Sequence, residues 1–396
     1  MPLFSNIIRL PALDVAGRRV FLRADLNVPL SGFGGVIDDT LLRAALPTIR
    51  ALLAADAKVV IGAHYGSEGA LAPRAAQHAV ARRLSELLGQ PVLALSTSFD
   101  GEVALLRARD VALTPNLLEL PEELANDAAF AQRVARHFDA HVNDDLRASS
   151  QRWASLDALP RALPVRGVGA ILGADLDALD LLSEHAIERP FVAVVGGDSV
   201  VRKSKLLWAL LERADALLLG GALANACLKA QGVSIGASAC DAQEQQAARA
   251  LLDGARERGV QIYLPQDVLV MDPEVGLASL ELRLVADVRP ADVIVDVALE
   301  TCMHYADVLA RSASVLYTGL LGTCTATELQ SGTFRVAQAA TTARRSMAFG
   351  DRTVRMLELL NLVTGFSIVS RSGTAAAPLM SGTVLPGIES ARSYAP

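Results

Sequence analysis

Short apolar runs alternate along this chain with longer amphipathic stretches. The short runs are rich in Val, Ile, Ala and Leu, which is typical of strands buried on both faces of a sheet. We predict ten such strands, at residues 20–22, 58–61, 92–93, 111–113, 192–195, 216–219, 261–264, 293–295, 314–317 and 366–369. A period of 3.6 residues predicts helices between them, at 43–54, 74–88, 126–138, 205–213 and 242–259. The alternation predicts an α/β fold in which helices cover both faces of parallel sheets.

A domain boundary is expected around a further predicted helix at 174–187, which is followed by Glu188-Arg189-Pro190 and a new apolar strand. The chain has 396 residues, more than the roughly 250–300 at which a single core stops growing. We therefore expect two doubly wound, Rossmann-like domains with parallel sheets, joined by a hinge helix.

Composition narrows the class of protein. Hydrophobic residues make up 52% of the chain and charged residues 20%, which indicates a folded protein without long disordered regions. No apolar run reaches the roughly 18 residues of a membrane span, and residues 1–6 lack the features of a secretory signal. We expect a cytoplasmic protein with no membrane partner.

The charge balance argues against nucleic acid as a partner. The chain has 37 basic and 43 acidic residues, a net charge of −6, so it offers no general attraction for nucleic acid. Only four of the basic residues are lysines. The four cysteines show no CxxC spacing, so we interpret them as reduced thiols and expect no metal site.

Several motifs, spread in order over nearly the whole chain, resemble those of phosphoglycerate kinases. They include FLRADLNVP at 21–29, IDDTLLRAALPTI at 37–49, RPFVAVVGG at 189–197, LGGALANACLKAQG at 219–232 and LPGIE at 385–389. The resemblance implies a domain for 3-phosphoglycerate at 1–172, a connecting helix at 173–188, a domain for ATP or ADP at 189–378, and a segment at 379–396 that returns to the first domain. It also implies a monomer whose hinge closes over its substrates.

On the substrate side, Asp25, Asn27 and His64 match residues that hold 3-phosphoglycerate in the family. Four positions that carry arginine in the family do not carry it here. They are Leu41, Ser67, Leu118 and Gln151. A charge-assisted hydrogen bond contributes roughly 1.5–3 kcal/mol, so the loss of four such contacts predicts poor binding of a phosphorylated acid.

On the nucleotide side, Gly196, Gly197 and Lys203 match the family, whereas Ser199 stands where a lysine would contact the transferring phosphoryl group. The family's Gly-Gly-Gly-Asp-Thr reads FGDRT at 349–353, so Asp351 could serve the metal only with a one-residue shift. Mg-ATP or Mg-ADP is expected only if nucleotide binding survives, and otherwise no cofactor. No residue is confidently assigned as catalytic.

Three interpretations stay open, so whether the chain is an enzyme is undecided. The first is a phosphoglycerate-kinase-like pseudoenzyme, with little or no phosphotransfer, that binds a small anionic ligand or a protein partner. The second is a divergent kinase or ligase-type enzyme acting on a different small acid. Its anion site would be built from new arginines in former active-site segments, namely Arg147, Arg152, Arg202, Arg352 and Arg371. The third is a weakly active phosphoglycerate kinase.

Overall fold

The computed structural model describes residues 4–65, 73–96, 100–181, 187–371, 379 and 383–392. The chain forms two compact units, one made of residues 1–177 with 383–396 and the other of residues 178–382. Each unit is built around a six-stranded parallel sheet, so the predicted fold class of two doubly wound parallel-sheet domains is confirmed.

In the first unit, the strand order is β3-β4-β2-β1-β5-β6. The strands are β1 (Arg19–Ala24), β2 (Lys58–Gly62), β3 (Val92–Ala94), β4 (Val111–Leu113), β5 (Ala140–Asp144) and β6 (Val165–Val168). The helices are α1 (Thr40–Ala54), α2 (Pro73–Leu88), α3 (Asp100–Ala104), α4 (Pro121–Leu124), α5 (Ala128–Ala135), α6 (Ala158–Arg161) and α15 (Pro386–Glu389), and α7 (Ala170–Leu181) crosses into the second unit.

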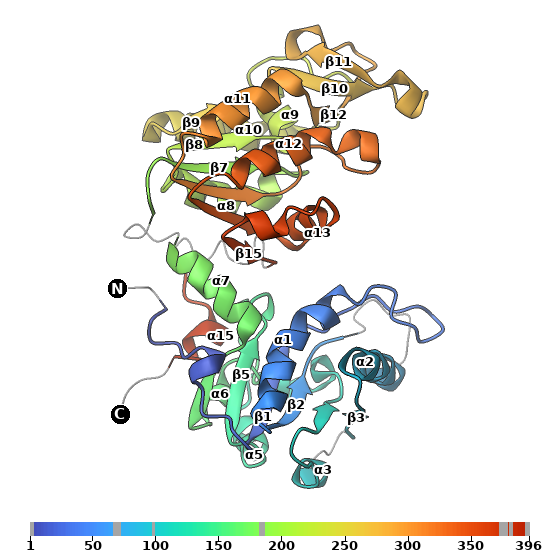
Figure 1. Ribbon diagram of the computed structural model, residues 1–396, viewed down its shortest axis with the longest axis vertical. Coiled ribbons are helices and arrows are strands. Elements are labelled where there is room, and N and C mark those ends of the chain that lie inside the picture. The colour runs from blue at the N-terminus through green and yellow to red at the C-terminus, as the bar shows by residue number, and fades with distance from the viewer. Residues whose placement is uncertain are drawn as a thin grey trace. The chain divides into compact units, whose positions relative to one another are not determined.

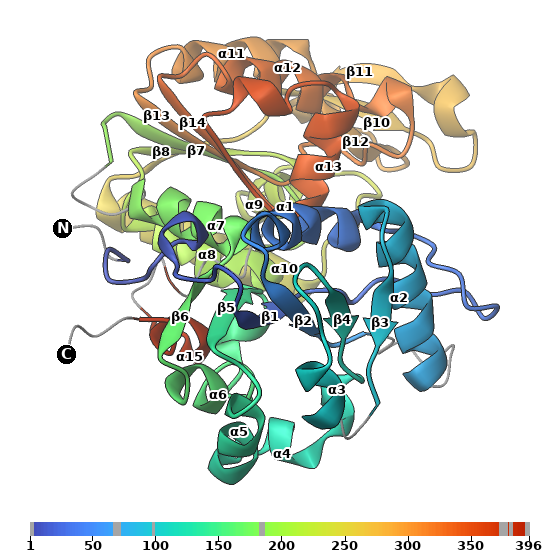
Figure 2. The same ribbon diagram turned by 60° about the horizontal axis from the view of Figure 1, so that its bottom comes forward.

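Helices lie on both faces of this first sheet (Figure 2), and a hydrophobic cluster packs on each face. Val20 and Leu22 of β1 belong to the cluster that includes side chains of α1 and α2, whereas Phe21 between them belongs to the cluster on α5 and α6. Because side chains alternate along a strand, a continuous apolar run fills both layers at once. This burial on both faces explains why short apolar runs in the sequence predict strands.

In the second unit, the main sheet has the order β15-β14-β13-β7-β8-β9, and a three-stranded antiparallel sheet has the order β11-β10-β12. The strands are β7 (Phe191–Val195), β8 (Ala216–Leu219), β9 (Gln261–Tyr263), β10 (Asp267–Met271), β11 (Glu281–Leu284), β12 (Val293–Val297), β13 (Ser314–Thr318), β14 (Arg345–Phe349) and β15 (Ile368–Ser370). The helices are α8 (Val200–Leu211), α9 (Gly221–Ala230), α10 (Ala242–Arg258), α11 (Leu299–Leu309), α12 (Ser331–Ala340) and α13 (Asp351–Leu359). Figure 1 labels most of these elements, and Figure 2 labels β13 and β14.

All ten predicted strands coincide with or overlap observed ones, but some helix boundaries differ. The helix predicted at 174–187 begins at Ala170, its described part ends at Leu181, and residues 182–186 lie outside the described chain. The helix predicted at 205–213 begins five residues earlier, at Val200, because Ser199 caps it. The helix predicted at 126–138 begins only at Ala128, since Asn126 has a positive φ of 53°.

The C-terminal segment packs on the first unit. The side chain of Asn143 donates to the carbonyl of Gly387 at 3.0 Å, and the hydroxyl of Ser390 donates to the carbonyl of Leu156 at 2.5 Å. The division between the two units falls inside α7, after Asp177. The exact domain boundaries at 172, 188 and 378 stay predictions.

Candidate functional site

A buried ion pair lies at the carboxyl end of β1. Because β1 pairs in parallel with β5, Arg23 lies opposite Asn143, and the residues that follow the two strands meet at one sheet edge. The Arg23 guanidinium contacts the Asp145 carboxylate at 2.9 Å, and their side chains are 1% and 4% exposed. Arg23 also donates to the carbonyl of Ala24 at 2.8 Å. The cation is therefore held by groups of this chain.

Asp25 follows the same strand and faces this ion pair. Burial, and then the charge of Asp145, raise the pKa of the Asp25 carboxyl, while Arg147 opposes the shift. Arg147 lies 3.6 Å from the Asp25 carboxylate but is itself mostly exposed. The backbone N–H of the exposed Asn27 donates to Asp25 at 3.2 Å. Asp25 and Asn27 therefore share one turn, beside a carboxylate that was not expected there.

His64 lies just beyond β2 and is neutral near pH 7. Burial lowers the pKa of its imidazole. The side chain of Arg23 can only donate, so at 3.3 Å it gives a hydrogen bond to Nδ1, which leaves the proton on Nε2. That Nε2 is buried with no hydrogen-bond partner, 3.8 Å from the carboxylate of Glu123. Trp153 packs edge-on against the imidazole, with 4.3 Å between ring centroids.

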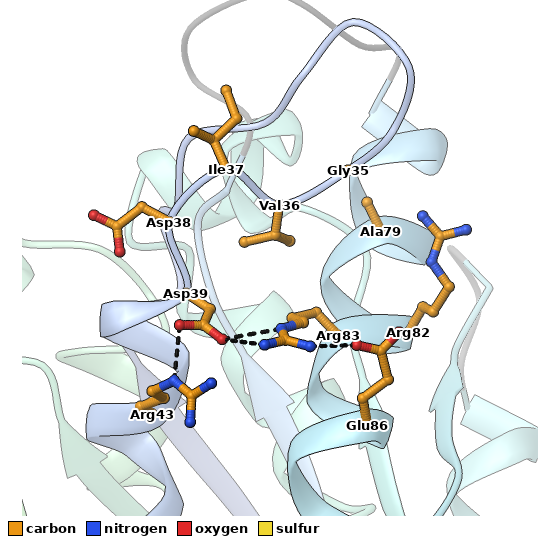
Figure 3. A pocket seen from close by; sticks show the side chains of 10 residues that line it. All are labelled: Gly35, Val36, Ile37, Asp38, Asp39, Arg43, Ala79, Arg82, Arg83 and Glu86. Atoms are coloured by element: carbon orange, nitrogen blue, oxygen red, sulfur yellow. Dashed lines mark hydrogen bonds and ion pairs between the residues drawn. The ribbon is translucent and has the colours of Figure 1, made fainter.

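The expected arginine position at 41 holds a half-buried leucine. Leu41 packs against the cluster between α1 and the sheet. Two residues earlier, Asp39 lies in a polar pocket of about 640 Å³ between α1 and α2, where Arg43 at 2.8 Å and Arg83 at 2.6 Å contact its carboxylate (Figure 3). These hydrogen bonds lower the pKa of Asp39. Arg43 and Arg83 are thus engaged by carboxylates, and Leu41 offers no charge.

The other former arginine positions carry no cation either. Leu118 is half-buried, and Gln151 is exposed; Ser67 lies outside the described residues. The new cation nearby, Arg152, contacts Asp157 at 2.9 Å.

In the second unit, the N-terminus of α8 holds Ser199 and a carboxylate from α10. Ser199 is the N-cap, and its hydroxyl oxygen accepts from the backbone N–H of Arg202 at 3.0 Å. The same hydroxyl donates to one oxygen of the Glu244 carboxylate. The other oxygen accepts from the N–H of Val200 at 2.7 Å. This helix end therefore already contains an anionic group.

Lys203 is folded back on the turn that precedes its own helix. Its ammonium donates to the carbonyl of Gly196 at 2.5 Å. Burial, with a contribution from Arg352, lowers the pKa of Lys203 to about 8. A Cβ on Gly196 would lie 2.1 Å from the carbonyl oxygen of Leu320, so only glycine allows β7 and the segment after β13 to approach this closely. Gly197, with a φ of +128°, also requires glycine.

Asp351 is not free to hold a metal. It is the first residue of α13, and its carboxylate is contacted by Arg355 at 3.0 Å and by Arg371 at 2.9 Å. Arg371 also pairs with Glu358. Among the described residues, no group of three or more His, Cys, Asp or Glu side chains is arranged to hold a metal ion.

The five new arginines are distributed over both units, and four of them contact carboxylates. Arg147 and Arg152 belong to the first unit, and Arg202, Arg352 and Arg371 belong to the second. Arg202 contacts Asp198 at 2.7 Å, and the partners of Arg147, Arg152 and Arg371 are given above. Arg352 is exposed and close enough to Lys203 to lower its pKa. The shared anion site stays a prediction.

Sequence reasoning missed Arg23, Asp145, Glu123 and Glu244. A signal existed for Glu244, because Asp241 and Glu244 have the spacing of a capping box and Asp241 does accept from the N–H of Glu244 at 2.8 Å. What no pattern revealed is that the Glu244 carboxylate reaches a different helix.

Comparison with known proteins assigns nearly the whole chain to one family. The model of the family described as phosphoglycerate kinase matches residues 10–383. The chain belongs to the phosphoglycerate kinase family. It is 34% identical to the phosphoglycerate kinase of Synechococcus elongatus and 36% identical to that of Maricaulis maris, each match covering 97% of both chains. Of solved structures, the phosphoglycerate kinases of Coxiella burnetii (30% identity, TM-score 0.83) and Pyrococcus horikoshii (26% identity, TM-score 0.79) match over 97% of this chain and 98% of theirs.

Family membership supports general statements about the kind of protein and its ligands. This is a phosphoglycerate-kinase-like protein with a transferase fold, from a family that generally uses Mg-ATP or Mg-ADP with small anionic substrates. None of the helices in the described ranges has the length and apolar character needed to span a bilayer.

Proposed function

We propose that this member of the phosphoglycerate kinase family transfers little or no phosphoryl group between ATP and 3-phosphoglycerate, and that it acts as a binding or regulatory protein. The proposal rests on the environment of Ser199. At the position where the family resemblance implies a lysine against the transferring group, this chain has a 6% exposed helix cap bonded to Glu244.

The physical reason lies in how phosphoryl transfer is catalysed. The protein supplies little covalent chemistry, and the rate depends on cations and N–H groups aimed at the charge of the transferring group. Here a hydroxyl and a carboxylate occupy that position in the second unit. In the first unit, an arginine position is taken by Leu41, which is half-buried and packs against the core. Each half of the reaction therefore lacks a cation that the family resemblance implies at the reacting group.

The residues at the nucleotide-type site do not fit Mg-ATP. Asp351, the residue considered for the metal, is held by Arg355 and Arg371. The first N–H groups of α8 already bond Glu244 and Ser199. Of the residues that keep the family pattern, Gly196 and Gly197 have a sufficient role in the close approach of backbone segments.

A coupled assay of ATP-dependent phosphorylation of 3-phosphoglycerate tests the proposal. The purified chain is compared with the Synechococcus elongatus relative at equal concentration, with Mg-ATP and 3-phosphoglycerate at millimolar levels. We expect turnover at least a thousandfold below the relative, because one lost preorganised charge contact at a reacting centre costs about 10²–10³ in rate and two such positions are changed. Turnover within tenfold of the relative would identify an ordinary kinase.

A further inference from the structure

A carboxylate of this chain closes the N-terminus of α8. The Glu244 oxygen that accepts from Val200 at 2.7 Å also lies 3.4 Å from the N–H of Val201. The Ser199 hydroxyl accepts from the third N–H, that of Arg202. The first three N–H groups of this 12-residue helix therefore all have acceptors from the chain itself. Free helix N-termini attract phosphate through such N–H groups and the helix dipole.

Positive charge gathers at the same helix end. Lys203 lies in the first turns of α8, and Arg352 from α13 is near enough to lower the pKa of Lys203. Arg202 is the third cation. Two carboxylates oppose them: Asp198, which is exposed and paired with Arg202, and Glu244, which bonds the helix end. Without Glu244, three cations would face one carboxylate, a balance that favours an anion.

Glu244 is held in this position by its own helix. It lies in the first turn of α10, and its N–H donates at 2.8 Å to Asp241, the N-cap of that helix. The backbone at Glu244 is fixed by the packed helix. With its backbone fixed, Glu244 reaches Ser199 and Val200 by adopting one side-chain rotamer.

We propose that Glu244 is an internal competitor that keeps phosphate away from the N-terminus of α8. The contact is autoinhibitory: the carboxylate occupies the N–H groups and cancels part of the positive charge that would otherwise bind a phosphate or a phosphoryl group. The inference rests on the proposed function, since it explains why the second unit should bind phosphate poorly.

Calorimetric titration with inorganic phosphate and with pyrophosphate tests this directly. The proteins are the wild type, E244A, E244Q and the control E257A, which removes a carboxylate that is 76% exposed further along α10. We expect E244A and E244Q to bind at least one of the two anions tenfold or more tightly than the wild type, and E257A to bind like the wild type. Circular dichroism checks that each variant is folded. E244Q keeps the side-chain length, so it carries the test if E244A does not fold.

A gain below tenfold in the folded Glu244 variants, or a gain that E257A matches, overturns the inference. These results are separate from the test of the proposed function. An active wild type in the coupled assay overturns the proposed function whatever the phosphate affinity of the variants. Unchanged phosphate affinity in an inactive protein overturns only the role of Glu244.

Discussion

The hydroxyl of Ser199 accepts one hydrogen bond and donates another, which a lysine side chain cannot do, because an ammonium has donors only. Ser199 accepts from Arg202 and donates to Glu244. The first unit shows a comparable change, since Asp145 pairs with the buried Arg23 beside Asp25. Ser199 joins the protein's own hydrogen-bond network where the family resemblance implies a lysine, and Asp145 does so beside Asp25, which the resemblance implies as a contact of 3-phosphoglycerate.

The buried pair of Arg23 and Asp145 gives a stability prediction. Asp145→Asn removes the negative charge and leaves the guanidinium of Arg23 buried without its counter-ion. We expect the free energy of unfolding to fall by about 3–5 kcal/mol, the usual effect of removing one partner of a buried pair. Urea denaturation measures it.

The matched control is Asp198→Asn, which removes the partner of the exposed Arg202. Pairs this exposed contribute about 0–1 kcal/mol, so its stability should stay close to that of the wild type. Equal losses in the two variants would show that burial of the Arg23 pair does not decide its contribution.

At the scale of elements, the strands were easier to predict than the helices. The buried strands are continuous apolar runs, such as 192–195, and their sequence alone marks them. The helices α9, α11, α12 and α13 were not predicted. They have only 9 to 11 residues, so each shows few repeats of the helical period, although α13 does bury Val354 and Leu357 on one face. The antiparallel sheet of β11, β10 and β12 was also missed. The sequence has no hairpin turn signal between β10 and β12, so it did not indicate that these two strands pair.

The candidate site was predictable only in part. Asp25, His64 and Lys203 could be found by their motifs, and the loss of charge at Leu41 and Ser199 was visible in the sequence. Their partners could not be found this way. Asp145 reaches Arg23 through the register of β1 with β5, and Glu244 reaches Ser199 across the space between two helices. Such contacts depend on packing, which no local pattern encodes.

Asp144 joins three elements and makes the stability of the first unit depend on pH. It ends β5, accepts from the Thr48 hydroxyl of α1 at 2.5 Å, and accepts from the N–H of Leu172 in α7 at 2.9 Å. Burial raises the pKa of its carboxyl to about 7. The native state therefore keeps the proton to higher pH than the unfolded chain does, so this contribution to stability is present below about pH 4 and is lost as the pH rises to about 7.

Asp144→Asn should remove that dependence. A shift of about three pKa units corresponds to about 4 kcal/mol, so the wild type should lose up to this amount between pH 4 and pH 7 relative to the variant. Urea denaturation at a series of pH values gives the difference. Asp296→Asn is the parallel variant in the second unit, where burial likewise raises the pKa of the Asp296 carboxyl to about 7. Parallel pH profiles for the wild type and both variants would contradict the assignment.

At the scale of the whole molecule, the fold and the chemistry of the family depend on different sets of side chains. Each unit keeps its sheet order and its hydrophobic clusters, which need only apolar side chains at the right positions. The charged contacts of phosphoryl transfer depend on a few individual side chains, and these can change without disturbing either core. A sequence identity of 34% therefore carries the fold over nearly the whole length but does not by itself carry the activity.

The last prediction concerns the response of the molecule to substrates. In this family, hinge closure brings the two substrates together, and a ligand can shift a conformational equilibrium only by its difference in affinity for the two states. If both half-sites bind weakly, Mg-ATP and 3-phosphoglycerate added together should leave the radius of gyration unchanged in small-angle X-ray scattering. The Synechococcus elongatus relative, measured with the same solutions, is the control for the ligands. A clear compaction of this chain, seen only with both ligands present, would mean that both half-sites still bind and that the domains still close, and it would contradict the proposed loss of function.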